Sequence, residues 1–162
     1  REWYLERIAA IKKHVPGVSI TTDMFTGFPG EADEDHELSL SLMNEVAFDA
    51  AFMFRYSERP GTYAAKKLKD DVPEHIKLRR LNEMIALQQD LSKISNEKEK
   101  GKEFKVLFEG ASRRSENDSV GRTCHNKKVV VKEQQIPVGR TGIVQIEEAS
   151  TATLFGTLKN EI

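Results

Sequence analysis

One segment, from Thr21 to Glu31, limits the possible folds more than any other part of the chain. It reads as an apolar strand that runs into a Gly-Phe-Pro-Gly turn and then into an acidic helix start. Such a turn places flexible backbone and a row of free amide groups at the carboxyl end of a strand, where α/β enzymes bind their ligands. The sequence therefore predicts part of an active site at this turn.

Helical and strand patterns alternate on both sides of the turn. A helix ends at Pro16-Gly17, the β-branched run 18–22 follows it, and a second helix follows the turn. Residues 50–54 form an unbroken apolar run, which is typical of a strand buried on both faces of a parallel sheet. This alternation indicates βαβ construction, with the turn and the loop 56–62 opening on the same side of the sheet. The expected buried stripes of the two helices are Tyr4, Ile8, Ile11 and Val15, and Leu38, Leu42 and Val46.

A long helix separates this part from a different pattern. Pro73 suits a first helical turn, and the apolar spacing continues the helix to about Lys98. Beyond Gly101, apolar residues alternate with polar ones and glycines separate short runs, which predicts a small all-β barrel. The predicted fold class is therefore α/β plus all-β. The expected strands of the barrel lie at 104–109, 129–131, 142–146 and 154–155.

The α/β part has too few strands to stand alone. Two parallel strands with three helices cannot close a barrel, so both sheet edges would present unpaired amides and carbonyls. We expect either that the chain self-associates near Ala50–Phe54, or that a larger barrel of the same protein supplies the neighbouring strands. Arg1 falls inside a helical pattern and is interpreted as a cut point rather than a natural start.

Composition excludes several classes of protein. One cysteine, Cys124, rules out an internal disulfide framework, and with four scattered histidines it leaves no ligand set at structural-zinc spacing. The formal net charge of −1 argues against a wholly basic nucleic-acid-binding protein. No apolar run approaches the roughly 20 residues that a membrane span needs. We therefore expect a protein of the reducing cytoplasm that has no membrane partner.

Three motifs carry a resemblance to a known family: ITTDMFTGFPGE at 20–31, FDAAFMFRYSERPGTYA at 48–64 and GRTCHNKKVVV at 121–131. In this order and spacing they closely resemble the C-terminal part of bacterial tRNA methylthiotransferases, and most of all the MiaB-type synthases of 2-methylthio-N6-isopentenyladenosine. The resemblance runs over nearly the whole chain. The first two motifs together are specific to methylthiotransferases rather than to radical enzymes at large.

The resemblance implies a division of the chain. Residues 1–98 would be the end of a radical S-adenosylmethionine (βα) barrel with its linking helix, and residues 99–162 would be a TRAM domain, a small RNA-binding β-barrel. The full-length enzymes of this family use S-adenosylmethionine and two [4Fe-4S] clusters to add a methylthio group to N6-isopentenyladenosine in the tRNA anticodon loop. The tRNA anticodon stem-loop and the missing N-terminal domains would be the partners of this chain.

Iron–sulfur clusters mark the difference between this chain and a complete enzyme. A cluster needs several thiolates, and the sequence has one cysteine. Because the cofactors carry the radical chemistry, we expect this chain alone to hold no metal, to bind no cofactor, to contain no catalytic residue and to be inactive.

Five residues are predicted to line the S-adenosylmethionine site: Asp23, Gly27, Gly30, Glu31 and Arg59. The glycines would let the backbone approach the ligand, the turn amides would hold its carboxylate or ribose, and Asp23 would accept from its amine or hydroxyls. Other readings stay open. The turn can simply reverse the chain, and Glu31 can be a carboxylate beside a helix start. Arg59 can pair with a carboxylate, with an RNA phosphate, or with a glutamate that fixes its loop.

The β-barrel is predicted to bind RNA, on its resemblance to TRAM domains more than on its charge. Lys and Arg exceed Asp and Glu by only two, 10 − 8, over residues 101–162. Asn126 and His125 also suit a hairpin turn, and Cys124 is given no role. Three other histidines, His14, His36 and His75, are expected at the surface. The predicted RNA-binding residues are Arg113, Arg114, Arg122, Asn126, Lys127, Lys128 and Arg140.

Two alternatives remain. One is a stand-alone RNA-binding module with a vestigial α/β half, and the other is a methylthiotransferase that modifies an aspartate of a ribosomal protein. The arginine-bearing YSERPGT loop and the NKKVVV strand favour the tRNA-modifying branch over the ribosomal-protein methylthiotransferase. An upstream reading frame that encodes CxxxCxxC would favour the enzyme over the stand-alone RNA-binding module.

Overall fold

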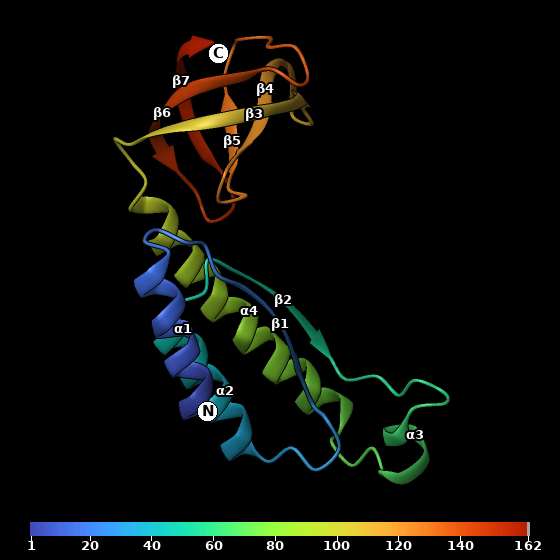
Figure 1. Cartoon of the computed structure of the whole chain (residues 1–162). Helices are drawn as coiled ribbons and strands as arrows, with labels where there is room; N and C mark the ends of the chain where they lie inside the picture. The colour runs from blue at the N-terminus through green and yellow to red at the C-terminus, as the bar shows by residue number, and fades with distance from the viewer. Residues whose placement is uncertain (162) are drawn as a thin grey trace. The chain divides into compact units, whose positions relative to one another are not determined.

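The computed structural model describes residues 1–161, which form two compact units (Figure 1). The first unit comprises Arg1–Leu91, and the second begins at Ser92. The units therefore divide within helix α4 (Glu74–Glu97), whereas the sequence predicts a domain boundary after residue 98. Among the described residues, no helix is both long enough and apolar enough to cross a membrane.

The first unit is a small parallel sheet with helices. Its strands β1 (Thr21–Thr26) and β2 (Ala50–Arg55) pair in parallel, with Thr21 opposite Ala50 and Thr26 opposite Arg55. The helix between β1 and β2 completes the βαβ unit that the alternating pattern predicts. The helices of this unit are α1 (Glu2–His14), α2 (Asp33–Val46), the short α3 (Tyr63–Lys67) and α4.

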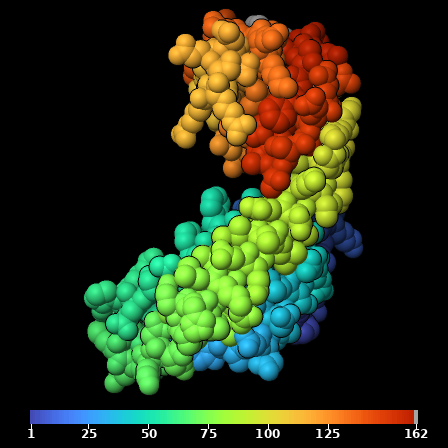
Figure 2. Space-filling view, turned by 180° about the vertical axis from the view of Figure 1, so that it is seen from behind, coloured from blue at the N-terminus to red at the C-terminus, as the bar shows by residue number. Residues whose placement is uncertain are grey.

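Helices cover only one face of this sheet. Met24 and Met53 face a buried cluster formed by Ile8 of α1, Met43 and Val46 of α2, Phe48, and Met84 of α4. Figure 2 shows the outer surface of α4 running between α2 and the segment that follows β2. On the opposite face, Phe25, Phe52 and Phe54 are 58, 63 and 58% exposed. The prediction that Ala50–Phe54 is buried on both faces is therefore wrong for this structure, because nothing among the described residues covers the second face.

The orientation of α2 differs from the sequence expectation. The structure turns this helix so that His36, Met43 and Val46 are buried, while Leu38 is 55% exposed. The expected surface position of His36 is wrong: its ring is 3% exposed, and its Nε2 lies 2.7 Å from a carboxylate oxygen of Glu83 on α4. A polar side chain can replace an apolar one on the packed face of a helix when a neighbouring helix supplies a hydrogen-bond partner.

The second unit is a closed barrel, as the sequence predicts, but it has five strands where the sequence indicates four. The strand order is β3-β4-β5-β7-β6, and β6 pairs with β3 to close it. All neighbouring strands are antiparallel except β5 and β7. The strands are β3 (Glu103–Ser112), β4 (Ser115–Thr123), β5 (Lys128–Val131), β6 (Thr141–Ala149) and β7 (Leu154–Glu161).

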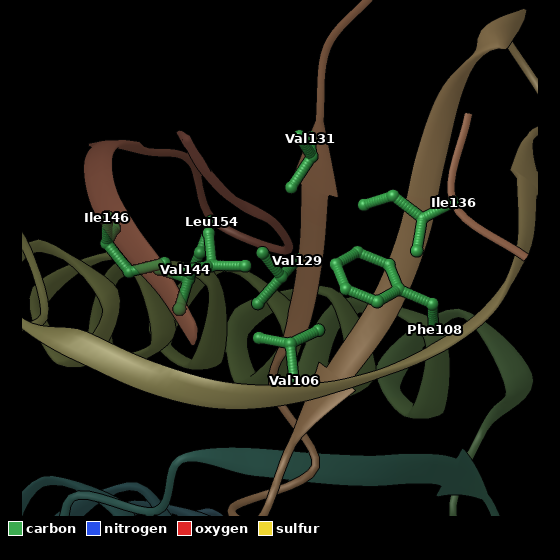
Figure 3. Packing of buried hydrophobic residues seen from close by; sticks show 8 residues of the cluster. All are labelled: Val106, Phe108, Val129, Val131, Ile136, Val144, Ile146 and Leu154. Atoms are coloured by element: carbon green, nitrogen blue, oxygen red, sulfur yellow. The ribbon is translucent and has the colours of Figure 1, made fainter. Parts of the chain in front are cut away.

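Branched and aromatic side chains fill the barrel interior (Figure 3). Phe108 is 1% exposed, and Val106, Val129, Val144 and Leu154 are fully buried. Their neighbours in the cluster are Val131, Ile136 and Ile146.

The sequence pattern does not predict strand β4, because this strand contributes small and polar residues to the buried side. Ser119 bonds to the backbone of the segment after β5: its hydroxyl donates to Gln134 O and accepts from Ile136 N, both at 2.7 Å. A Cβ on Gly121 would lie 2.4 Å from Leu107 O of the adjacent strand, so only glycine fits there.

Replacing Phe108 with alanine should lower the free energy of unfolding of the second unit by about 3–5 kcal/mol, because it leaves a cavity in a closed interior. Urea unfolding followed by the backbone NMR signals of β3 to β7 measures this. Val138→Ala, at a side chain that is 71% exposed, is the control and should change the value by less than about 0.5 kcal/mol. Equal effects of the two substitutions would show that Phe108 does not organise the interior.

Candidate ligand wall and nucleic-acid interface

The turn between β1 and α2 is held by the carboxylate of Glu31. This carboxylate accepts hydrogen bonds from Thr26 Oγ1 and Gly27 N, both at 2.8 Å, and from Phe28 N at 3.4 Å. Gly30 N donates to Asp71 Oδ1 at 2.8 Å, and Glu31 N donates to Phe28 O. The expectation of a row of free amides is therefore wrong, because these amides donate to two carboxylates and a backbone carbonyl of the protein itself. Glu31 has a structural role, and its contact with a cofactor stays a prediction.

The two glycines of this turn have backbone conformations that other residues rarely adopt. The φ angles are +81° at Gly27 and +84° at Gly30. A Cβ on Gly27 would lie 2.4 Å from Cγ of Lys77, so the stem of this α4 lysine packs directly against the turn. Gly27 thus serves close packing within the chain, which is a different use from the predicted approach of a ligand.

Arg80 of α4 also binds the turn between β1 and α2. Its side chain is 4% exposed, and its guanidinium donates to Glu31 Oε1 at 2.8 Å, to Glu31 O at 3.1 Å and to Asp33 Oδ1 at 3.0 Å. The hydrogen bonds from Arg80 and Arg79 hold the pKa of Asp33 below its ordinary value. Burial opposes the charge of Arg80, but its bonds to Asp33 and Glu31 outweigh that cost and raise its pKa.

Lys77 connects the turn to the loop after β2. This buried lysine, 3% exposed, donates to both carboxylate oxygens of Asp70 at 2.7 and 2.6 Å. Its Nζ also lies 5.2 Å from the ring centroid of Tyr56, which is a cation–π contact. The first turns of α4 therefore fix both loops at the carboxyl ends of the strands. Figure 1 shows these two loops leaving the sheet at the same end.

The residues that hold the loops were missed in the sequence, although a signal for them exists. Lys77, Arg80, Met84 and Gln88 recur at helical spacing, and all four are buried. Two charged residues on an otherwise buried stripe predict buried acidic partners, because an unpaired buried charge is costly.

A hollow of about 410 Å³ opens where β1 and β2 end. Phe28 contacts Tyr56 edge to face at 5.2 Å between ring centroids, and Phe25 contacts Phe28 at 5.9 Å. Among the predicted cofactor residues, only Arg59 lines this hollow. Its full lining is Phe25, Phe28, Phe54, Arg55, Tyr56, Ser57, Arg59, Thr62 and Ala64.

The predicted cofactor residues fall into three settings rather than one cluster. Gly27, Gly30 and Glu31 belong to the braced turn, and Arg59 lies at the hollow. Asp23 lies on the open face of the sheet, opposite Phe52, and within the described part of the chain its carboxylate forms no hydrogen bond or ion pair. Within residues 1–161, no group of three or more histidine, cysteine, aspartate or glutamate side chains is arranged to hold a metal ion.

The predicted RNA-binding residues of the barrel also differ in availability. Arg113 and Arg114 form the exposed turn between β3 and β4, and Arg140 is exposed just before β6. Arg122 lies on the outer face of β4, where it pairs with Glu109 at 3.3 Å and donates to Asn126 O at 3.0 Å. Such exposed pairs contribute little to stability, so a phosphate can replace the glutamate at small cost.

Registers place Arg122 in a row that crosses four strands. Thr141 of β6 lies opposite Leu107 of β3, Leu107 opposite Arg122 of β4, and Arg122 opposite Lys128 of β5. Directly opposed residues share one face of a sheet, so the row runs over the outside of the barrel. It forms a surface with two cations and an exposed leucine.

Lys127 is not part of that surface. Its side chain is 10% exposed, and its ammonium donates to Ser95 O at 3.2 Å, Ser95 Oγ at 2.8 Å and Glu99 Oε1 at 3.2 Å. Burial alone would raise the pKa of Glu99, but hydrogen bonds and charge from Lys102 and Lys127 outweigh it and lower that pKa. Lys127 therefore holds the end of α4 to the barrel, and its contact with RNA stays a prediction.

Replacing Arg80 with methionine should lower the free energy of unfolding of the first unit by about 3 kcal/mol, because Glu31 keeps a largely buried charge without its partner. Urea unfolding followed by NMR signals of β1 and β2 measures the loss. Arg79→Met is the matched control: Arg79 also pairs with Asp33 but is 49% exposed, so less than about 1 kcal/mol should be lost. A similar loss in both variants would contradict the bracing role of Arg80.

Replacing Lys127 with methionine should raise the pKa of Glu99 toward its ordinary value, because one of two nearby cations is removed. In the wild-type protein the lowered pKa adds stability to the second unit above about pH 4.5, and this is lost as the pH falls through the folded-state pKa. A carbon-detected NMR titration of the Glu99 carboxyl measures its pKa in the wild-type protein and in the Lys127→Met variant. Lys128→Met should leave the titration unchanged, and an unchanged titration in Lys127→Met would refute the contact.

Comparison with known proteins agrees with the arrangement of the chain. Residues 97–159 match the family described as TRAM domain. A tRNA-2-methylthio-N(6)-dimethylallyladenosine synthase of Azobacteroides pseudotrichonymphae genomovar. CFP2 is 53% identical over 159 residues, which is 98% of this chain and 35% of the relative. Synthases of the same name from Bacteroides thetaiotaomicron and Bacteroides fragilis are 56% identical over 156 residues, 96% of this chain and 34% of each relative.

The chain thus spans about a third of the length of the curated relatives it matches. These matches confirm the resemblance that the three sequence motifs indicate. The chain therefore matches the C-terminal portion of tRNA-2-methylthio-N(6)-dimethylallyladenosine synthases, including a TRAM domain.

Proposed function

We propose that this chain provides the C-terminal portion of a methylthiotransferase that adds a 2-methylthio group to N6-isopentenyladenosine in the anticodon loop of tRNA. The observation that carries the proposal is the identity of 53–56% over nearly the whole chain to synthases named for this modification. The names of these relatives favour the tRNA-modifying branch over a ribosomal-protein methylthiotransferase. The chain would act in the cytoplasm.

The second unit would hold the anticodon stem-loop. A closed barrel with Arg113 and Arg114 at a hairpin tip, and with Arg122 and Lys128 on one outer row, offers cations at several points along a phosphate backbone. Arg140 and Asn126 would add contacts near this row. A stand-alone RNA-binding module remains a second candidate, because the barrel closes without strands from the first unit.

The first unit would form part of the wall of a radical S-adenosylmethionine barrel. The open face of β1 and β2 would then be an inner face of that barrel, and neighbouring strands would pair with the edges of this two-stranded sheet. Asp23 carries a negative charge there, which suits the sulfonium or ammonium of S-adenosylmethionine. When bound, the cofactor supplies the radical chemistry. The iron–sulfur clusters do not fit this chain, whose single cysteine, Cys124, lies in the second unit.

Titration with a tRNA anticodon stem-loop across a salt series tests RNA binding. The wild-type chain should bind with an affinity that falls steeply with salt, and the double substitution Arg113→Gln, Arg114→Gln should reduce the slope of log K against log salt by about 2. Lys13→Gln with Lys69→Gln removes the same charge from exposed positions of the first unit and is the matched control. Equal slopes in all three proteins would contradict this assignment, and no binding at low salt would contradict RNA binding by this chain.

A further inference from the structure

We propose that Lys127 is a positioning residue for RNA binding. It ties the β4–β5 hairpin (residues 122–128) to the end of α4, and the fixed hairpin then presents its other polar side chains to RNA. This positioning role rests on the proposed function, because it deepens the RNA-binding role of the second unit. It gives Lys127 an indirect part in place of the direct RNA contact that the sequence predicts. All residues that carry it lie beyond Ser92, in the second unit.

The ammonium of Lys127 is bound by the end of α4 and the residues that follow it. The side chain is 10% exposed, and its Nζ lies 2.8 Å from Ser95 Oγ and 3.2 Å from both Ser95 O and Glu99 Oε1. A lysine ammonium has three hydrogens to donate, so these acceptors match its capacity. A phosphate that bound Lys127 would have to displace them.

Within the hairpin, Thr123 fixes the backbone. Its Oγ1 accepts from His125 N and Lys127 N, both at 3.2 Å, and its own N donates to Lys127 O at 3.0 Å. Asn126 N donates to Thr123 O at 3.0 Å. The φ angle of Asn126 is +60°, which asparagine adopts more readily than most residues. The hairpin therefore has a defined shape, and Lys127 attaches that shape to α4.

The neighbours of Lys127 are the residues that stay available to RNA. Arg122 and Lys128 lie opposite each other in the β4–β5 register, and the side chain of Arg122 is 43% exposed. The Arg122 guanidinium donates to Asn126 O at 3.0 Å and to Asn126 Oδ1 at 3.1 Å. Because Asn126 directly precedes Lys127, a hairpin released from α4 would also lose this alignment. Side chains that are ordered before binding lower the cost of ordering them on RNA.

The end of α4 is itself held to the barrel at a second place. Asn96, which is 8% exposed, donates to Ser150 O at 2.9 Å and to Thr151 O at 3.1 Å in the segment between β6 and β7. Gly101 N donates to Ile146 O of β6 at 2.8 Å. The helix end is thus a fixed base for the hairpin. Part of this base precedes residue 97, where the match to the TRAM domain begins.

Titration of the chain with a tRNA anticodon stem-loop across a salt series separates positioning from direct contact. A side chain that neutralises a phosphate changes the slope of log K against log salt by about 1, whereas a positioning residue changes the affinity and leaves the slope. Lys127→Met should therefore weaken binding about fivefold at every salt concentration. Lys127→Arg keeps a cation for Ser95 and Glu99 and should restore most of the affinity. Lys128→Met is the matched control and should reduce the slope by about 1.

For the substitution Glu99→Gln, the two roles of Lys127 predict opposite signs. The substitution removes a negative charge, so it would release Lys127 and strengthen binding if this lysine contacted a phosphate. If Lys127 positions the hairpin, Glu99→Gln should weaken binding about threefold, and the double variant should bind no more weakly than Lys127→Met alone. Glu97→Gln is the matched control: Glu97 pairs with Lys100, so its loss should not weaken binding.

Three results would overturn the positioning role: a slope reduced by about 1 in Lys127→Met, an unchanged affinity in that variant, or tighter binding by Glu99→Gln. Amide NMR spectra should keep the signals of β3, β6 and β7 in Lys127→Met and shift those of the hairpin. If that variant unfolds the barrel, the sign of the Glu99→Gln effect decides. Salt-dependent binding with any of the three results rejects the positioning role alone. No binding by the wild-type chain at low salt rejects the RNA-binding function and the positioning role with it.

Discussion

The buried ion pair between Arg80 and Glu31 is the interaction on which the first unit depends. A turn with two glycines at positive φ has little stiffness of its own, and its shape comes from the carboxylate that collects its amides. That carboxylate is itself held by a guanidinium that is almost fully buried. One helical turn earlier, Lys77 packs on Gly27 and contacts Tyr56. The order of the loops at the end of the sheet is thus imposed by α4, a helix distant in sequence from the turn it braces.

Two chemically different surfaces result. The first unit exposes aromatic rings and two arginines at the ends of its strands. The second exposes cations on a closed barrel whose interior is branched and apolar. In this unit a lysine again has an anchoring role, because Lys127 is bound by Ser95 and Glu99 while its neighbour Lys128 faces outward beside Arg122. Of these two adjacent lysines, one anchors a helix and the other lies on the outer surface, and a count of charges cannot distinguish the two roles.

Much of the fold follows from the sequence, and the site follows less well. Periodicity places β1, α2, β2 and the long helix, and the alternation beyond Gly101 indicates the barrel. Strand β4 is hidden because Ser119 and Gly121 give it no apolar signal, and α2 is rotated because His36 finds a partner in Glu83. Sequence motifs locate the turn between β1 and α2 correctly but suggest that its amides are free. The carboxylates that accept from these amides, Glu31 and Asp71, are determined by tertiary contacts that local patterns do not encode.

The most direct test of the account is a hybrid enzyme in which this chain replaces the matching 156 residues of the Bacteroides thetaiotaomicron synthase. The measurement is the ratio of 2-methylthio-N6-isopentenyladenosine to N6-isopentenyladenosine in tRNA, by mass spectrometry, in a host that lacks its own synthase. We expect the hybrid to restore the methylthio nucleoside. A hybrid that accumulates to the level of the parent enzyme, yet leaves the tRNA with N6-isopentenyladenosine alone, would contradict the assignment of this chain to that activity.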